Sequence, residues 1–84
     1  MPTLTLYTKP DCSLCDEAFA ALERVRARVP FDLDLVDISN DFDLAERYGE
    51  RIPVVLIDGA EAFEYVVDES ALEQALGAAA GATR

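Results

Sequence analysis

The two cysteines, Cys12 and Cys15, are the residues whose type and spacing point most directly to chemistry. The chain has no histidine, which excludes a histidine-based triad and a histidine-ligated metal. Cys12-Ser13-Leu14-Cys15 follows a break at Lys9-Pro10-Asp11 and opens a helical pattern, so the two sulfurs should lie one helical turn apart. Because a bridge between them closes a very small loop, it would add little stability, and we interpret their role as chemical rather than structural.

Cys12 is the predicted nucleophile of this pair. A free thiol has a pKa near about 8.5, and the unpaired N–H groups and positive end of a helix favour the thiolate. We therefore expect Cys12, at the helix start, to be the more acidic and more exposed thiol. Cys15 lies one turn deeper and can attack a mixed disulfide on Cys12, which makes it the predicted resolving residue.

Charged residues flank the predicted nucleophile. Lys9, the only lysine, stands three residues before Cys12, where its ammonium could favour the thiolate or meet a substrate carboxylate. Nearby negative charges oppose the ionisation of a thiol, and they come from Asp11, Asp16 and Glu17. We expect Cys12 to be activated less strongly than in a purely cationic setting.

The periodicity of the chain predicts four strands and three helices. The predicted strands cover residues 3–8, 31–35, 52–57 and 60–67, and the predicted helices cover residues 14–29 and 42–48 and a last segment that starts at Ser70. Pro30 should stop the first helix, and Gly49 should end the second in a left-handed conformation. Ser70-x-x-Glu73 reads as a capping box, and Asp58-Gly59 as a hairpin turn.

The resulting order, β-α-β-α-β-β-α, predicts an α/β fold with a four-stranded mixed sheet flanked by three helices. Residues 3–8 and 52–57 should form central strands, and residues 31–35, which alternate with aspartates, should form an edge. Cys12 would then lie beyond the carboxyl end of a central strand, where sites in such sheets tend to lie. Residues 1–84 should form one domain with a frayed tail over residues 78–84.

The amino-acid composition limits which classes of molecule the protein is expected to bind. The chain has 84 residues, with 7 basic and 17 acidic side chains and a net charge of −10, and 51% of its residues are hydrophobic. This favours a folded monomer, and the negative charge argues against nucleic-acid and membrane partners. Neither a signal peptide nor an 18-residue apolar run is evident, so we expect a cytoplasmic protein.

Ile52-Pro53 is the second unusual feature. A proline in an apolar strand removes a hydrogen-bond donor from the sheet, and a cis Ile52-Pro53 bond at the strand start would explain its presence there. The alternative is a trans proline that opens an edge strand.

These residues together resemble the glutaredoxins and the small glutaredoxin-like proteins of the thioredoxin superfamily. The resemblance rests on Thr8-Lys9-Pro10-Asp11-Cys12-Ser13-Leu14-Cys15 after a strand, and on Ile52-Pro53 before an apolar strand and an Asp-Gly hairpin; it covers residues 3 to 76. It implies a thioredoxin-like fold of the glutaredoxin type and thiol–disulfide exchange at Cys12 with resolution by Cys15. It also implies a cis Pro53 beside the sulfurs, and a backbone at Ile52 that pairs with a bound peptide or glutathione.

Departures from the family pattern concern the substrate. Glutaredoxins typically carry a Gly-Gly pair followed by an Asp after the fourth strand, whereas this chain has Glu64 and Tyr65 in that stretch. Their bulk and charge would hinder glutathione, although Asp68 matches the acidic residue of the family. Arg51 stands near a family Thr and is expected to supply a cation for the ligand.

The predicted function is a thiol–disulfide oxidoreductase that reduces protein or glutathione mixed disulfides. Glutathione would be a co-substrate rather than a bound cofactor, and a reductase would supply the electrons. Two alternatives stay open. One is a thioredoxin-fold redox-sensing or interaction domain with little turnover. The other is thiolate binding of zinc or an iron–sulfur cluster, which would need a dimer or external thiols because one chain offers two cysteines.

Overall fold

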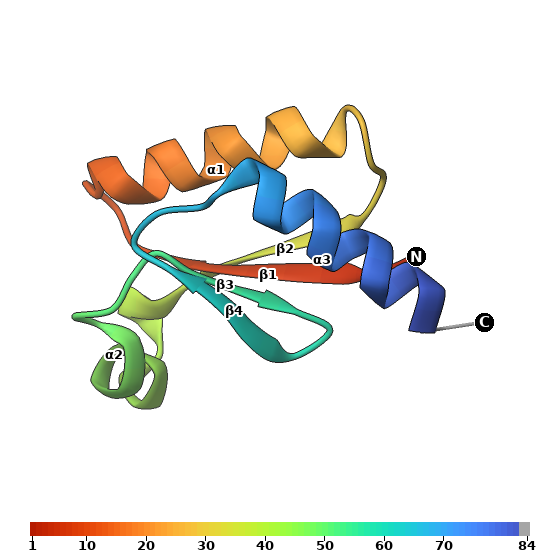
Figure 1. Cartoon of the computed structure of the whole chain (residues 1–84). Helices are drawn as coiled ribbons and strands as arrows, with labels where there is room; N and C mark the ends of the chain where they lie inside the picture. Colours follow the sequence, from red (N-terminus) through yellow and green to blue (C-terminus); the bar gives the residue numbers. More distant parts are fainter. Residues whose placement is uncertain (83–84) are drawn as a thin grey trace.

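The computed structural model describes the backbone of residues 1–82 and the side chains as far as Gly77. It contains the seven predicted elements in the predicted order, together with one short 3-10 turn (Figure 1). The elements are β1 (Thr3–Thr8), α1 (Ser13–Arg26), β2 (Asp32–Asp37), the turn η1 (Ile38–Asn40), α2 (Phe42–Tyr48), β3 (Val54–Ile57), β4 (Ala60–Glu64) and α3 (Glu69–Ala82).

The four strands form one mixed sheet in the order β2-β1-β3-β4. β1 pairs with β2 in parallel and with β3 antiparallel, and β3 pairs antiparallel with β4 through the Asp58-Gly59 hairpin. The central positions of β1 and β3 and the edge position of β2 confirm the sequence prediction. The physical reason is burial, because Val54 and Val55 are inaccessible on opposite faces of β3, whereas the aspartates of β2 are exposed.

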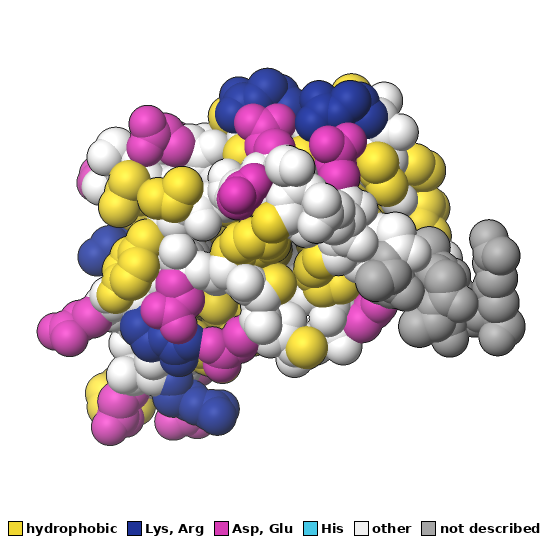
Figure 2. Space-filling view, viewed as in Figure 1, with side chains coloured by type: hydrophobic (Ala, Val, Ile, Leu, Met, Phe, Trp, Pro, Cys, Tyr) yellow, Lys and Arg dark blue, Asp and Glu magenta, His cyan; other side chains and the backbone are white. Residues whose placement is uncertain are grey.

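Helices cover both faces of the sheet, with α1 and α3 on one side and α2 on the other (Figure 1). The larger core cluster lies under α1 and α3 and includes Leu6, Leu22 and Leu72. The smaller cluster lies on the α2 side and contains Cys15. Exposed ion pairs join α1 and the turn after it to α3, and Figure 2 shows basic and acidic side chains side by side on the upper surface. Such exposed pairs add little stability, so burial carries the fold.

Three elements are shorter than the sequence predicts. β3 begins at Val54 instead of residue 52, after the Ile52-Pro53 bond. α1 ends at Arg26 instead of residue 29, and residues 27–29 form a turn between its C-cap Ala27 and Pro30. Residue 29 directly precedes the proline and is biased away from the helical conformation. β4 ends at Glu64 instead of residue 67, because Tyr65 adopts a positive φ of 64° that turns the chain out of the sheet. The segment between Tyr65 and α3 is therefore a loop and not a strand.

The prediction that Ser70 caps the last helix is wrong. α3 begins at Glu69, and the carboxylate of Asp68 accepts the Ala71 N–H at 3.1 Å as the N-cap. Aspartate caps as well as serine, and the earlier start adds residues to the helix. α3 extends to Ala82, and residues 83–84 lie outside the described part. The fraying of residues 78–84 stays a prediction.

The prediction of a left-handed Gly49 is also wrong. Gly49 has φ −54° and ψ −33°, which is right-handed helical backbone. A β-carbon at this position would collide with the carbonyl oxygen of Ala45, so glycine permits a close approach of two backbone segments. The chain then turns after α2, and the N–H groups of Arg51 and Ile52 both donate to the Tyr48 carbonyl, at 2.8 and 3.1 Å.

Replacing Asp68 with alanine should lower the free energy of unfolding by about 1 kcal/mol, since the Ala71 N–H loses its acceptor at the start of α3. Ser70→Ala is the matched control and should have a much smaller effect. Urea denaturation of both variants measures the difference. A larger loss for Ser70→Ala than for Asp68→Ala would contradict the observed cap.

Two glycine substitutions should act in opposite directions. Gly49→Ala should destabilise the protein by more than about 1 kcal/mol, because the new methyl group meets the Ala45 carbonyl. Gly77→Ala should stabilise it by about 0.5–1 kcal/mol, because Gly77 lies in α3 with open space around its missing side chain. Thermal unfolding of the two variants tests this contrast, and equal signs would refute it.

Candidate functional site

Cys12 and Cys15 lie at the amino end of α1 and form a disulfide, with their Cα atoms 5.2 Å apart. Cys12 is the N-cap of the helix, and its sulfur accepts the Cys15 N–H at 3.1 Å. The preceding residue, Asp11, has a positive φ of 59°, which turns the chain from β1 into the helix. The predicted position of the first sulfur at a helix start is therefore confirmed.

The two sulfurs differ in accessibility. Cys15 is 2% exposed and belongs to the smaller core cluster, whereas Cys12 is half-buried and packs against the edge of that cluster. A bulky partner can therefore approach Cys12 while Cys15 stays covered. This agrees with the predicted difference in exposure.

Ile52-Pro53 lies on the same side of the sheet as the cysteines. The bond is cis, as the sequence predicts, and Pro53 is fully buried. Ile52 shares the core cluster of Cys15, so the structure brings Ile52 together with both cysteines. The carbonyl of Pro53 accepts the Tyr65 N–H at 2.8 Å, which connects this bend to the end of β4.

Arg51, the residue before Ile52, is held between two carboxylates. Its Nε donates to Glu64 at 3.1 Å, and one terminal nitrogen also contacts both Glu61 and Glu64. The guanidinium lies 5.1 Å from the ring centre of Tyr48. Hydrogen bonds with Glu64, and then with Glu61, raise the pKa of Arg51, so it stays charged. We call Glu61, Arg51 and Glu64 the carboxylate clamp.

A β-bulge makes the clamp possible. Residues three apart in a regular strand point to opposite faces of the sheet, which would separate Glu61 from Glu64. The register shifts between Val55 and Leu56, so Leu56 pairs with Glu61 and Val54 with Glu64. An extra residue in β4 therefore returns both carboxylates to the face that carries α2.

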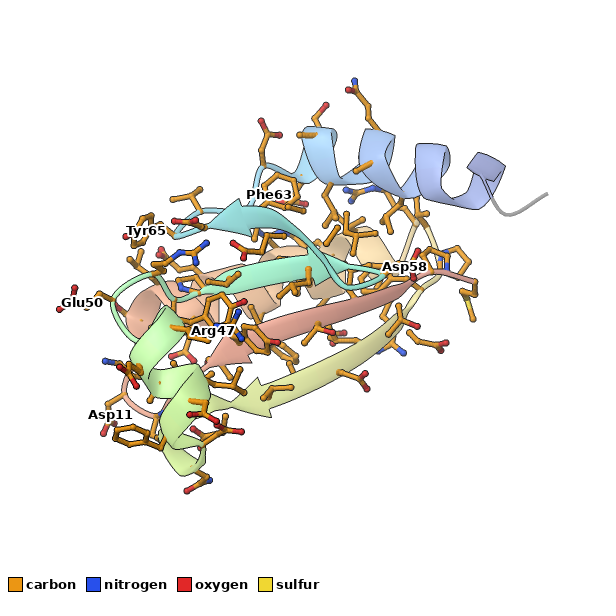
Figure 3. All side chains as sticks on the ribbon, turned by 90° about the horizontal axis from the view of Figure 1, so that it is seen from below. Asp11, Arg47, Glu50, Asp58, Phe63 and Tyr65 are labelled. Carbon is orange, nitrogen blue, oxygen red and sulfur yellow. A yellow bond between two sulfur atoms is a disulfide. The ribbon has the colours of Figure 1, made fainter. Side chains whose placement is uncertain are left out.

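Tyr65 ties the end of β4 to the loop before β3. Its hydroxyl donates to the Glu50 carbonyl at 3.0 Å, and its N–H bonds to Pro53. Figure 3 shows Tyr65, Glu50 and Asp11 at the end of the molecule opposite Asp58 and the hairpin. Tyr65 therefore connects two loops, and it lies in the stretch where glutaredoxins typically carry a glycine pair.

Lys9 and Asp68, the remaining predicted site residues, lie outside this contact network. Lys9 is exposed in the β1–α1 loop, which also carries Cys12. The Asp68 carboxylate is engaged as the cap of α3. Within residues 1–82, no group of three or more His, Cys, Asp or Glu side chains is arranged to hold a metal ion. No helix of this described part is long and apolar enough to cross a membrane.

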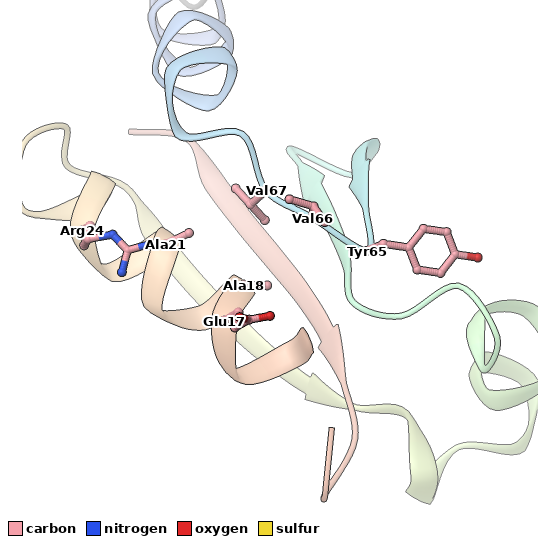
Figure 4. Close-up of a pocket in the computed structure, with 7 residues that line it drawn as sticks. All are labelled: Glu17, Ala18, Ala21, Arg24, Tyr65, Val66 and Val67. Atoms are coloured by element: carbon pink, nitrogen blue, oxygen red, sulfur yellow. The ribbon is translucent and has the colours of Figure 1, made fainter. Parts of the chain in front are cut away.

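Two cavities flank α1. The first, of about 210 Å³, lies between α1 and residues 65–67, and its lining contains Glu17 and Arg24 but neither cysteine (Figure 4). The second, of about 200 Å³, is lined by Cys15, Phe19 and Leu35 on the β2 side of the helix. Cys12 lines neither of these two cavities.

Sequence reasoning missed Tyr48, Glu61 and Tyr65 as parts of the site. Tyr48 packs beside Cys15, and its ring also lies 4.8 Å from that of Tyr7. The position of Tyr48, at the end of a predicted helix and shortly before Ile52-Pro53, could have indicated that it belongs to the site. The positions of Glu61 and Tyr65 depend on the bulge and on a positive φ, for which the sequence offers no clear mark.

Comparison with known proteins assigns the chain to a family. Residues 3–77 match the family described as Glutaredoxin-like domain (DUF836). An uncharacterised protein of Mycobacterium tuberculosis is 30% identical over 76 residues, which cover 84% of this chain and 78% of the relative.

Solved structures agree with this family assignment. A structural-genomics target protein from X. campestris is 35% identical with a TM-score of 0.75, and the match covers 89% of this chain and 96% of that one. A thioredoxin variant from Halobacterium salinarum, 23% identical with a TM-score of 0.67, shares the fold over 92% of this chain and 73% of its own. The chain therefore belongs to the glutaredoxin-like domain family (DUF836) and has the thioredoxin fold.

Proposed function

We propose that this protein is a thiol–disulfide oxidoreductase in which Cys12 is the nucleophile and Cys15 the resolving thiol. The observation that carries the proposal is the disulfide at the start of α1, in which Cys15 is buried and Cys12 is half-buried. A difference in access lets a substrate sulfur reach Cys12 first and leaves Cys15 in reserve. The positive end of α1 supports a thiolate at Cys12 in the reduced protein.

The exchange proceeds in two substitutions at sulfur. The Cys12 thiolate attacks the substrate disulfide, a mixed disulfide forms, and one substrate thiolate leaves and takes a proton from water. The Cys15 thiol then loses its proton and attacks the Cys12 sulfur. The Cys12–Cys15 disulfide forms and the second substrate thiol leaves. Two electrons pass from the protein dithiol to the substrate.

Three groups near the cysteines favour this sequence of steps. The Cys15 N–H, 3.1 Å from the Cys12 sulfur, can also donate to a Cys12 thiolate. The N–H of Ile52 is already bonded to Tyr48, so a bound peptide would pair with the Ile52 carbonyl. Lys9 shares the loop of Cys12 and can orient a substrate carboxylate.

Turnover needs a reductant for the oxidised pair. We propose that thiols such as glutathione, or a dithiol reductase, regenerate the cysteines, and that a disulfide-bearing protein or a glutathione mixed disulfide is the substrate. The protein would work as a monomer in a reducing compartment, the cytoplasm, where structural disulfides are rare and catalytic ones are transient.

Substitution of each cysteine should separate the two roles. Cys12→Ser should abolish reduction of a small disulfide, while Cys15→Ser should accumulate a mixed disulfide on Cys12, because no neighbouring thiol releases it. Intact-protein mass spectrometry after reaction with oxidised glutathione measures both outcomes. Reduction that survives Cys12→Ser would remove Cys12 from its role. Oxidation of the wild-type protein without turnover would instead favour a redox-sensing domain.

Alkylation should distinguish the two thiols of the reduced protein. Iodoacetamide should modify Cys12 before Cys15 across neutral pH, because Cys15 is 2% exposed in its core cluster while Cys12 is accessible at the helix start. Peptide mapping after short exposures gives the two rates. Unfolding in urea is the control and should make the rates similar. Equal rates in the folded protein would contradict the proposed division of roles.

A further inference from the structure

We propose that the carboxylate clamp and the acidic surroundings of Cys12 make this site select cationic over anionic disulfides. The inference rests on the proposed oxidoreductase function and adds a substrate class to it. The preferred substrates would be disulfides flanked by lysine or arginine in a protein or peptide. Glutathione disulfide, which carries a net negative charge, would be disfavoured.

The clamp removes the cation that an anionic ligand would meet beside Ile52. Arg51 is the chain neighbour of Ile52, which packs with the cysteines, and its guanidinium lies 5.1 Å from the Tyr48 ring of the same cluster. Glu61 and Glu64 both contact this guanidinium. Two carboxylates against one guanidinium leave this part of the site with a net negative charge.

The charged side chains around the clamp also add up to a net negative charge. The β1–α1 loop and the first turns of α1 carry Lys9 against Asp11, Asp16 and Glu17. The α2 side adds Arg47 and, on the acidic side, Asp41, Asp43, Glu46 and Glu50. Carboxylates thus outnumber cations at this end of the molecule, where Figure 3 shows Asp11 and Glu50. The whole chain has a net charge of −10 in addition.

The electrostatic field of these carboxylates changes the rate at which a charged substrate associates with the site. Charged surroundings change association rates by about 10–10³-fold, and the effect falls as salt screens it. The screening length is about 30 Å at 10 mM salt and about 3 Å at 1 M salt. A charged disulfide that reaches Cys12 therefore experiences the clamp and its neighbours at low salt and little of them at high salt.

A single-turnover experiment tests this selection without an added reductase. The reduced protein is mixed with cystamine, a dication, with bis(2-hydroxyethyl) disulfide, which is neutral, or with dithiodipropionate, a dianion. In each case the Cys12–Cys15 disulfide forms, the substrate disulfide breaks, and two substrate thiols are released. Acid quenching, alkylation of free thiols and mass spectrometry give the rates. Rates with a neutral small thiol correct for the intrinsic reactivity of each disulfide.

The corrected rate should be about tenfold or more higher for cystamine than for dithiodipropionate at low salt, with the neutral disulfide between them. The cystamine rate should fall and the dithiodipropionate rate should rise as salt increases, so that the three converge near 1 M salt. This measurement uses the wild-type protein and does not depend on any variant.

A pair of charge-matched variants then locates the effect. Glu61→Gln/Glu64→Gln frees Arg51 and should reduce the preference for cystamine severalfold. Glu69→Gln/Glu73→Gln removes the same charge from carboxylates that pair with Arg24 and Arg28. Arg24 lies about 18 Å along α1 from Cys12, at 1.5 Å per residue, so this control should keep the wild-type preference.

The outcomes separate the two proposals. Equal corrected rates, or faster reaction with the dianion at low salt, would overturn the charge selection while the oxidoreductase function stands. An equal loss of preference in both double variants would assign the effect to net charge and overturn the role of the clamp. Absence of reaction with all three disulfides would overturn the proposed function itself.

Discussion

The burial of Cys15 in the core cluster that also contains Ile52 and Tyr48 is the constraint on which the site depends. It fixes the first turn of α1 against the start of β3 and the end of α2, three segments that are far apart in the sequence. Cys15 is held in this cluster, whereas Cys12 is the N-cap of the helix and is only half-buried. A loss of this packing would remove the difference in access between the two sulfurs.

The same cluster joins the cysteine pair to the charged residues around it. Tyr48 belongs to the cluster, and the Arg51 guanidinium lies 5.1 Å from the centre of its ring. Through Arg51, β4 is connected to the loop that carries the cis bond. Tyr65 reinforces this connection with bonds to Pro53 and Glu50. The region that offers a glycine pair in glutaredoxins is thus occupied here by polar contacts within the protein.

These contacts change what the arginine can do. Arg51 was expected to provide a cation for a ligand, and the structure instead satisfies it with two glutamates. An ion pair at the surface adds little stability, because solvent screens it and side-chain entropy opposes it. The clamp therefore contributes little to stability, and its main consequence is that the Arg51 guanidinium is already paired with carboxylates of the same chain.

The sequence by itself determined the order of elements, the central and edge strands, the cis Ile52-Pro53 bond and the position of Cys12 at a helix start, because these follow from local periodicity and residue chemistry. Only the tertiary structure decided that Asp68 caps α3, that Gly49 has a right-handed helical backbone, and that Glu61 and Glu64 pair with Arg51. Counting outward from the Asp58-Gly59 turn places Phe63 opposite Val54, whereas the bulge places Glu64 there. A one-residue shift reverses which face each side chain occupies, and packing across the sheet, not local propensity, selects that shift.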